Sequence, residues 1–136
     1  MNDRCFALLV HERPAPLESL KSALKDLSVE TYSVRSCTGA KRLIPQTQPL
    51  LVFTDTVLPD GSWRDVIELA ENAGSPVNVI VVGTHQDVKF YLTALECGAF
   101  DFVLPPFEHE ALDFIVQSAC RNARLRRQVR TRAGMD

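Results

Sequence analysis

The chain contains no apolar run long enough to cross a membrane, and its first residues lack the pattern of a secretory signal. We therefore expect one cytoplasmic domain that has no membrane partner. Glycine is also scarce, and the residues after the first apolar run, 11–14, form no Gly-rich loop. Such a loop holds phosphate with backbone amides, so its absence disfavours a flavin- or nucleotide-binding enzyme of the same fold class.

Metal, disulfide and nucleophilic chemistry have little support in the sequence. The cysteines form no Cys-x-x-Cys pair, and none has a histidine at metal-ligand spacing; they are Cys5, Cys37, Cys97 and Cys120. This scatter favours reduced, partly buried thiols over a disulfide or a zinc site. His85 and His109 follow apolar runs, but no Ser or Cys nucleophile elbow accompanies them. We therefore expect no enzyme.

Charge divides the chain into two zones. Residues 121–136 contain six arginines and one aspartate, which gives +5. Residues 1–120 contain nine basic and sixteen acidic side chains, which gives −7. The acidic body and the basic tail are predicted to have different roles.

Short apolar runs alternate with segments of helical periodicity. The predicted strands are Cys5–Val10, Thr31–Ser36, Leu50–Thr54, Val77–Val82 and Phe100–Leu104. Helices are expected over Leu17–Leu27, Thr38–Thr47, the segment after Ser62, Gln86–Glu96 and Glu108–Arg130. Five alternations with short loops predict an α/β fold, a doubly wound, flavodoxin-like sheet of five parallel strands in the order 2-1-3-4-5.

Three of these helices carry further expectations. Ser62 is predicted to cap its helix with Asp65 three residues on, and Pro45 to truncate or kink the helix over Thr38–Thr47. The helix over Gln86–Glu96 is predicted to bury its apolar face, which consists of Val88, Tyr91, Leu92 and Leu95.

Polar side chains follow three of the predicted strands: His11 and Glu12, Asp55, and Thr84. In a doubly wound sheet, ligands bind in the crevice outside the carboxyl ends of the strands. We therefore expect Asp55 to emerge into an open hollow, near enough to Glu12 to share Mg²⁺, which prefers oxygen ligands. Alternatively, Asp55 is a helix cap or an Asx-turn residue.

Four motifs together resemble the receiver domain of bacterial two-component response regulators. They are Val52-Phe53-Thr54-Asp55 with Leu58-Pro59-Asp60-Gly61, Val79–Thr84, Ala94–Phe102, and Pro106-Phe107. The resemblance implies that Asp55 accepts a phosphoryl group, that Thr84 and Phe102 form the conformational switch, and that Glu12 with Asp55 holds Mg²⁺. Phe102 could equally be a plain core aromatic.

Two residues depart from the family pattern. His11 stands where the first of two acidic residues is expected, and imidazole is a poor ligand for Mg²⁺. Pro105 stands where the family has a lysine that pairs with the phosphate, and proline offers neither a charge nor a donor. We therefore predict impaired phosphorylation of Asp55. His11, if protonated, or Arg13 could supply the missing cation.

The predicted organisation is a receiver domain over residues 1–120 and a basic helical extension over 121–136 that leads to an output domain outside this chain. The resemblance implies a phosphorelay protein that regulates transcription, a histidine kinase as partner, a homodimer, and DNA contact only through the output domain. Two alternatives remain open: a phosphorylation-independent dimerisation domain and a flavin- or nucleotide-binding protein.

Overall fold

The computed structural model describes residues 5–134, and their five long strands form one parallel sheet. The strand order is β2-β1-β3-β6-β7, which confirms the predicted 2-1-3-4-5 topology. The strands are β1 (Phe6–Val10), β2 (Glu30–Val34), β3 (Leu51–Asp55), β6 (Asn78–Val82) and β7 (Asp101–Val103). Two short strands, β4 (Val57–Leu58) and β5 (Gly61–Ser62), form a hairpin after β3 that the sequence did not predict.

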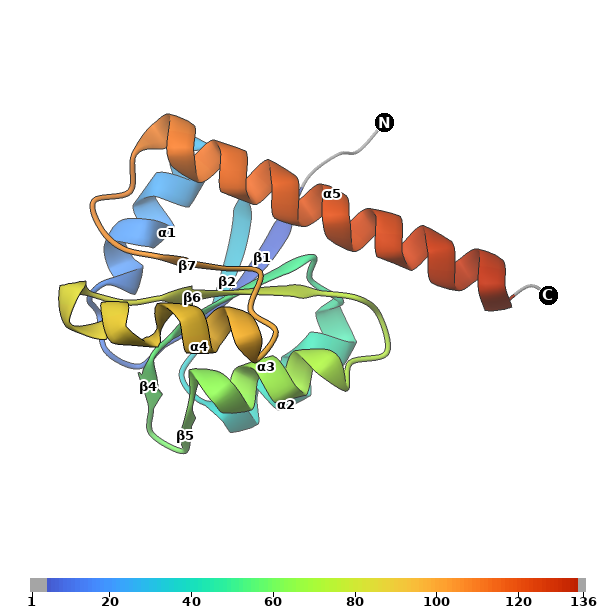
Figure 1. Ribbon diagram of the computed structural model, residues 1–136, viewed down its shortest axis with the longest axis horizontal. Coiled ribbons are helices and arrows are strands. Elements are labelled where there is room, and N and C mark those ends of the chain that lie inside the picture. The colour runs from blue at the N-terminus through green and yellow to red at the C-terminus, as the bar shows by residue number, and fades with distance from the viewer. Residues whose placement is uncertain (1–4, 135–136) are drawn as a thin grey trace.

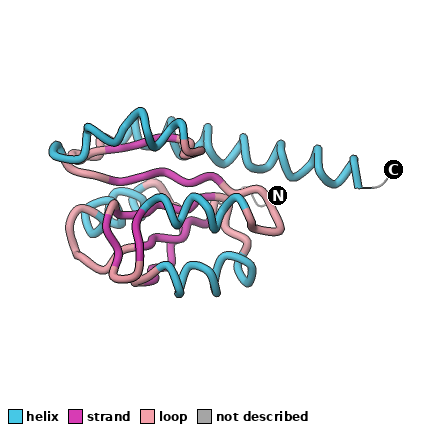
Figure 2. Tube along the Cα trace, turned by 60° about the horizontal axis from the view of Figure 1, so that its bottom comes forward, coloured by secondary structure: helices cyan, strands magenta, loops and turns pink. Residues whose placement is uncertain are grey.

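Helices cover both faces of the sheet (Figures 1 and 2). They are α1 (Leu17–Asp26), α2 (Cys37–Thr47), α3 (Trp63–Glu71), α4 (Tyr91–Glu96) and α5 (His109–Gly134), with a 3₁₀ helix, η1 (His85–Phe90), before α4. One core packs α1 and α5 on the sheet, and the other packs α2, α3 and α4 on the opposite face. No helix in residues 5–134 has the length and apolar character needed to cross a bilayer.

The central strand β3 faces both cores, and all five of its residues are buried. Phe53 packs in the core beneath α1 and α5, and Val52 packs in the core beneath α2 and α3. Successive side chains of a strand point to opposite faces, so a strand covered on both sides is apolar almost throughout. Asp55 ends this strand and therefore lies at the carboxyl edge of the sheet.

A capping interaction begins α3, as the sequence predicted. Ser62 accepts a hydrogen bond from the backbone of Arg64 (3.2 Å), and Asp65 accepts one from the backbone of Ser62 (2.9 Å). The capping box is therefore confirmed. Pro45 lies in the last turn of α2 and does not truncate it, because the helix continues to Thr47.

The prediction of one helix over Gln86–Glu96 with a buried apolar face is wrong. The chain forms η1 and then a short α4 in place of one helix, and only Ala94 of α4 is buried. Tyr91 is 41% exposed and Leu92 is 69% exposed, and Val88 of η1 is also exposed. The small Ala94 lies against the sheet, whereas Leu95 is only half-buried and the other three residues of the predicted face are exposed.

The prediction of reduced cysteines is wrong for two of the four, Cys5 and Cys120. A disulfide joins Cys5, directly before β1, to Cys120 in α5, with the two Cα atoms 6.4 Å apart. These residues are 115 positions apart in the chain, so only the packing of α5 across the start of β1 brings them together. Cys37 and Cys97 are free.

Candidate functional site at the carboxyl edge of the sheet

Asp55 is fully buried at the end of β3, and the guanidinium of Arg13 covers it. Arg13 Nε donates to Asp55 Oδ2 (3.0 Å), and Arg13 Nη2 donates to Asp55 Oδ1 (2.7 Å). The backbone N–H of Thr56 also donates to Asp55 Oδ1 (2.7 Å). The expectation that Asp55 emerges into an open hollow is therefore wrong, because both of its oxygens are engaged and shielded from water.

Arg13 lies in the loop after β1 and has one side in water, since its side chain is 52% exposed. The hydrogen bonds to Asp55 raise the pKa of Arg13 against the opposing effect of burial, and the charges of Asp55 and Asp87 contribute in the same direction. The guanidinium is therefore a fixed positive charge between a buried carboxylate and the solvent.

His11 fixes the backbone of the loop that carries Arg13. Its N–H donates to the carbonyl of Val34 (2.9 Å), and its ring Nδ1 lies 2.8 Å from the carbonyl oxygen of Arg13. A carbonyl only accepts, so Nδ1 carries the proton of this hydrogen bond. The ring is 7% exposed, and its buried Nε2 has no hydrogen-bond partner among the described residues. His11 therefore holds Arg13 in place and offers no oxygen for a metal.

Glu12 does not share a cation with Asp55 in this arrangement. Its side chain is exposed, while both oxygens of Asp55 accept hydrogen bonds from Arg13. No group of three or more His, Cys, Asp and Glu residues within the described chain could hold a metal ion. Because Mg²⁺ needs oxygen ligands that are free to coordinate, the residues do not fit this ion while Arg13 covers Asp55.

Thr84 lies two residues beyond β6, at the same edge of the sheet, but its hydroxyl does not bond Asp55. The Oγ1 and the backbone N–H of Thr84 both donate to Asp87 Oδ2, at 3.1 and 2.9 Å. Thr84 is exposed and caps η1. Sequence reasoning missed Asp87, although a Thr followed three residues later by an acidic residue is a capping-box signal.

Phe102 points inward from β7 and is 7% exposed. Its ring meets the ring of Tyr91 edge to face, with centroids 6.1 Å apart and an interplanar angle of 81°. A Cβ atom added to Gly83 would lie 2.7 Å from Phe102 Cζ, so the absence of a side chain at Gly83 makes room for the aromatic ring. Phe102 and Thr84 are thus linked through Gly83, which directly precedes Thr84.

Pro105 follows β7 at the same edge and contributes no charged donor. Arg13, from the loop after β1, is the cation that contacts Asp55. From the sequence, Arg13 was only one of two candidates for the missing cation, because no local pattern links it to Asp55. The carboxyl edge therefore combines a buried aspartate, a covering arginine and a capped threonine.

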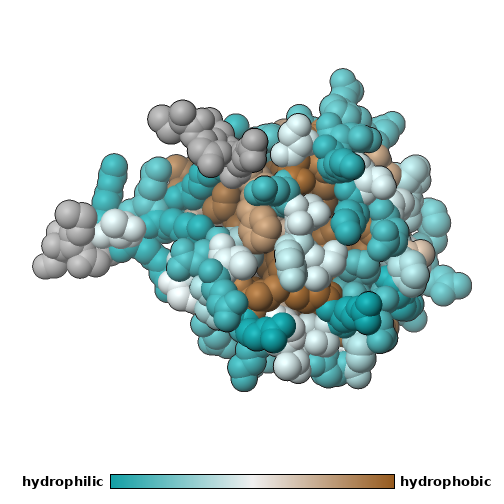
Figure 3. Space-filling view, turned by 180° about the vertical axis from the view of Figure 1, so that it is seen from behind, coloured by the Kyte–Doolittle hydropathy of each residue, from teal (hydrophilic) through white to brown (hydrophobic). Residues whose placement is uncertain are grey.

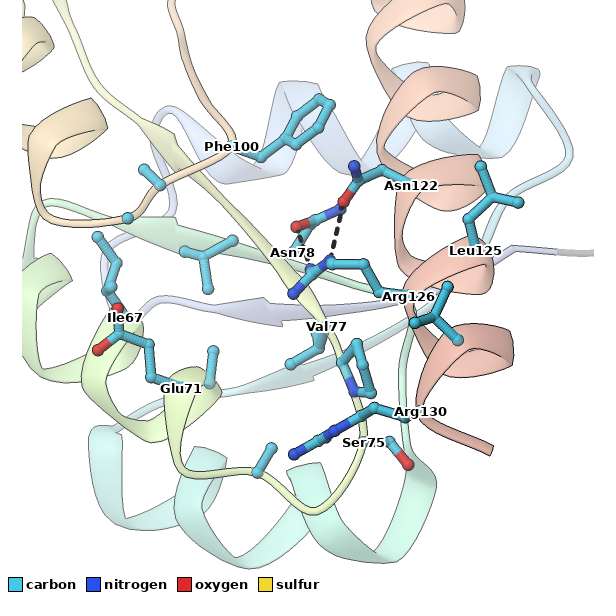
Figure 4. Close-up of a pocket in the computed structure, with 17 residues that line it drawn as sticks. Ile67, Glu71, Ser75, Val77, Asn78, Phe100, Asn122, Leu125, Arg126 and Arg130 are labelled. Carbon is cyan, nitrogen blue, oxygen red and sulfur yellow. Dashed lines mark hydrogen bonds between the residues drawn. The ribbon is translucent and has the colours of Figure 1, made fainter. Parts of the chain in front are cut away.

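The basic helix contacts the opposite end of the sheet. Arg127 donates to the carbonyls of Pro76 (2.8 Å) and Pro49 (2.9 Å), and Arg126 donates to Asn78 Oδ1 (2.6 Å). These contacts lie beside an open groove of about 850 Å³ between α3 and α5, with Phe100 on its wall (Figure 4). Helix α5 crosses residues 120–121 without a break and extends away from the domain (Figure 1).

The fold and the site define a doubly wound α/β domain with a buried aspartate at the carboxyl edge of its parallel sheet. A sequence model described as the response regulator receiver domain matches residues 7–117. The chain belongs to this family.

Two bacterial regulators are similar to this chain. The response regulator protein PilR of Pseudomonas aeruginosa is 30% identical over 115 residues, which cover 85% of this chain and 26% of PilR. The nitrogen assimilation regulatory protein NtrX of Azorhizobium caulinodans is 30% identical over 126 residues, which cover 90% of this chain and 28% of NtrX. The chain thus spans about a quarter of the length of these relatives.

Solved structures have the same fold. The signal receiver domain of a putative LuxO repressor protein from Vibrio parahaemolyticus superposes with a TM-score of 0.78 at 27% identity, covering 93% of this chain and 97% of that one. The receiver domain of the sensor histidine kinase PA1611 from Pseudomonas aeruginosa has a TM-score of 0.72 at 19% identity, covering 86% and 98%. That structure contains a magnesium ion coordinated in its active site cleft.

Proposed function

We propose that this chain is a signal-receiving module in the cytoplasm whose phosphoacceptor candidate, Asp55, is masked by Arg13. The observation that carries the proposal is the bidentate contact of Arg13 with a carboxylate that has no exposed surface. An oxygen that accepts two hydrogen bonds and is closed to solvent is a poor nucleophile toward a phosphodonor. Displacement of Arg13, by a partner such as a histidine kinase, is the step that admits the signal.

The two departures from the family pattern, His11 and Pro105, are also expected to slow the phosphorylation of Asp55. Asp55 lacks the lysine that would stand at Pro105, and His11 supplies no carboxylate for Mg²⁺. Each charge-assisted hydrogen bond that is lost from the phosphorylated state costs about 1.5–3 kcal/mol. Since ~1.4 kcal/mol changes a rate tenfold, phosphorylation is expected to be slower by about one to two decades.

The output is an altered contact with a second copy of the chain or with a partner, and through it the control of transcription by an output domain that contacts DNA. An exposed apolar surface on both sides of the edge strand β7 supports this part of the proposal. It comprises Val88, Tyr91 and Leu92 from η1 and α4, and Phe114 from α5, which is 73% exposed. The face that lies behind in the view of Figure 1 has hydrophilic residues around a central group of hydrophobic ones (Figure 3).

Incubation with acetyl phosphate and Mg²⁺, followed by intact-mass measurement, tests the masking of Asp55. We expect little or no gain of one phosphoryl group by the wild type and at least a tenfold faster gain by Arg13→Ala. Arg42→Ala, which changes an exposed arginine of α2, is the matched control. Rapid, stoichiometric phosphorylation of the wild type would contradict the proposal, as would a loss of phosphorylation in Arg13→Ala.

A phosphorylation-independent dimerisation domain is the second candidate, and the buried ion pair at Asp55 favours it over a flavin- or nucleotide-binding protein. The oligomeric state of Asp55→Asn and of Leu92→Ser, measured by sedimentation, distinguishes this dimerisation domain from the signal-receiving module. A dimer that Leu92→Ser disrupts and Asp55→Asn leaves unchanged, with or without phosphodonor, supports the constitutive dimer. A purified protein that lacks flavin absorbance and bound nucleotide would exclude a flavin- or nucleotide-binding protein.

A further inference from the structure

The disulfide lies at the opposite end of the sheet from Asp55. Cys5 precedes β1 directly, and β1 pairs in parallel with β3, which ends at Asp55. In this register Asp55 is level with His11, so about six residue steps of extended strand, roughly 20 Å, separate the disulfide from Asp55. Both cysteines are buried in the core that α5 forms with the sheet, Cys5 with 7% and Cys120 with 1% exposure.

Hydrogen bonds hold α5 to the sheet on both sides of Cys120. The side-chain amide of Asn78, at the start of β6, donates to the carbonyl of Ala119 (2.8 Å). Two turns further along α5, Arg127 donates to the carbonyl of Pro49, close to the start of β3. The disulfide adds a covalent tie to the start of β1, so α5 is joined to three strands at their amino ends.

We propose that Cys5 and Cys120 form a redox-controlled clamp that fixes α5 on the sheet, a second input that does not act through Asp55. On oxidation, the two thiols lose two protons and two electrons. A low-molecular-weight disulfide accepts them and becomes two thiols, or hydrogen peroxide accepts them and becomes two waters. On reduction by a dithiol, the cysteines return to thiols and only hydrogen bonds and packing hold α5.

A reversible clamp requires the cytoplasmic location given in the proposed function. Disulfides persist in oxidising compartments, whereas those of reducing cytosol are transient and redox-sensing. Buried thiols in apolar surroundings react slowly. The clamp therefore responds to sustained oxidation and not to brief exposure. Cys5 has the larger exposure, so its thiolate is the one that attacks the oxidant first.

The two remaining cysteines do not compete for this bond. Burial, together with the charge of Asp60, raises the pKa of Cys37 to about 11, so little of it is thiolate near neutral pH. Cys97 is exposed at the end of α4, and its oxidation would link two separate chains. Cys97→Ser is therefore a suitable control for the experiment.

The test counts thiols in the full chain after exposure to oxidised glutathione or to dithiothreitol, by alkylation under denaturing conditions and mass spectrometry. We expect four alkylated cysteines after reduction of the wild type; in Cys97→Ser we expect three after reduction and one after oxidation, with a Cys5–Cys120 cross-linked peptide. Asp55→Asn and Cys97→Ser are expected to retain this cross-link, whereas Cys5→Ser and Cys120→Ser lose it. Oxidation is expected to raise the midpoint of thermal unfolding by about 5–15 °C and to slow amide exchange around Cys120.

Four alkylated cysteines after prolonged oxidation, or a cross-link of Cys5 or Cys120 to Cys37 or Cys97, would overturn the proposal. So would a disulfide that dithiothreitol does not reduce in the folded protein, since such a bond is a permanent tie and not a clamp. These outcomes are independent of phosphorylation at Asp55, so the failure of one proposal is distinguishable from the failure of the other.

Discussion

The guanidinium of Arg13 binds the carboxylate of Asp55 across 42 positions of sequence and engages both of its oxygens. The pair joins the loop after β1 to the end of β3, two strands that are neighbours in the sheet. It therefore closes the crevice in which a doubly wound sheet binds its ligands.

Arg13→Ala is expected to lower the free energy of unfolding by about 1–3 kcal/mol, because it leaves a buried carboxylate with only one donor. The value lies below that of a fully buried pair since the side chain of Arg13 is half exposed. Urea unfolding measures the loss, with Arg42→Ala as control. If Asp55→Asn in the Arg13→Ala background restores no stability, the loss has another cause.

Mg²⁺ at millimolar concentration is expected to leave the wild-type protein unchanged, because Arg13 engages both oxygens of Asp55. The single tryptophan, Trp63, begins α3, and its backbone N–H bonds the carbonyl of Thr56, next to Asp55. Its fluorescence is a local probe for a titration with MgCl₂ against CaCl₂ and NaCl at equal ionic strength. A saturable change specific to Mg²⁺ would show that the ion displaces Arg13.

Asp60 is expected to make stability depend on pH below about 4. Hydrogen bonds from the backbone of Cys37 and from Thr38, at the start of α2, lower the pKa of Asp60 from 3.8 to about 2. Since the folded pKa lies below the unfolded value, the carboxylate stabilises the fold above pH 3.8, and this contribution is lost as the pH falls toward 2.

The comparison of Asp60→Asn with Asp26→Asn, which changes an exposed residue of α1, isolates this contribution. Thermal midpoints measured between about pH 2 and 5 should fall less steeply for Asp60→Asn than for the wild type and the control. Parallel curves for all three proteins would contradict the assignment.

Gly83→Ala is expected to destabilise the protein by about 1–3 kcal/mol, because overpacking forces neighbouring side chains to shift. The added Cβ would lie 2.7 Å from Phe102 Cζ and 2.9 Å from Asp87 Cβ. Gly74→Ala is the matched control, since a Cβ there has no atom within 4 Å. Equal unfolding free energies for the two variants would show that Phe102 moves without cost.

Local patterns predicted the fold because each depends on neighbouring residues. The buried run of β3, the Ser62–Asp65 cap and the alternation of strands and helices all appear within a few positions of sequence, and they determine the topology. The membership in the receiver family follows from the same short motifs.

The details of the site depend on contacts between distant residues, which periodicity does not encode. The reach of Arg13 to Asp55 and the meeting of Cys5 with Cys120 both require the completed sheet. The outward direction of Leu92 has a similar cause, because the apolar spacing does not tell which face of α4 meets the sheet. The burial of Asp55 depends on the position of Arg13, so the sequence around Asp55 alone does not predict it.

Arg126 and Arg127 fix the second half of α5 to the amino ends of β3 and β6, and the helix continues beyond these contacts. The helix has 26 residues, which corresponds to a length of about 39 Å. A tilt of about 5° at its first turn would sweep the far end through roughly 3 Å, provided the helix stays straight. The hydrogen bonds from Arg126 and Arg127, together with the disulfide at Cys120, resist such a swing.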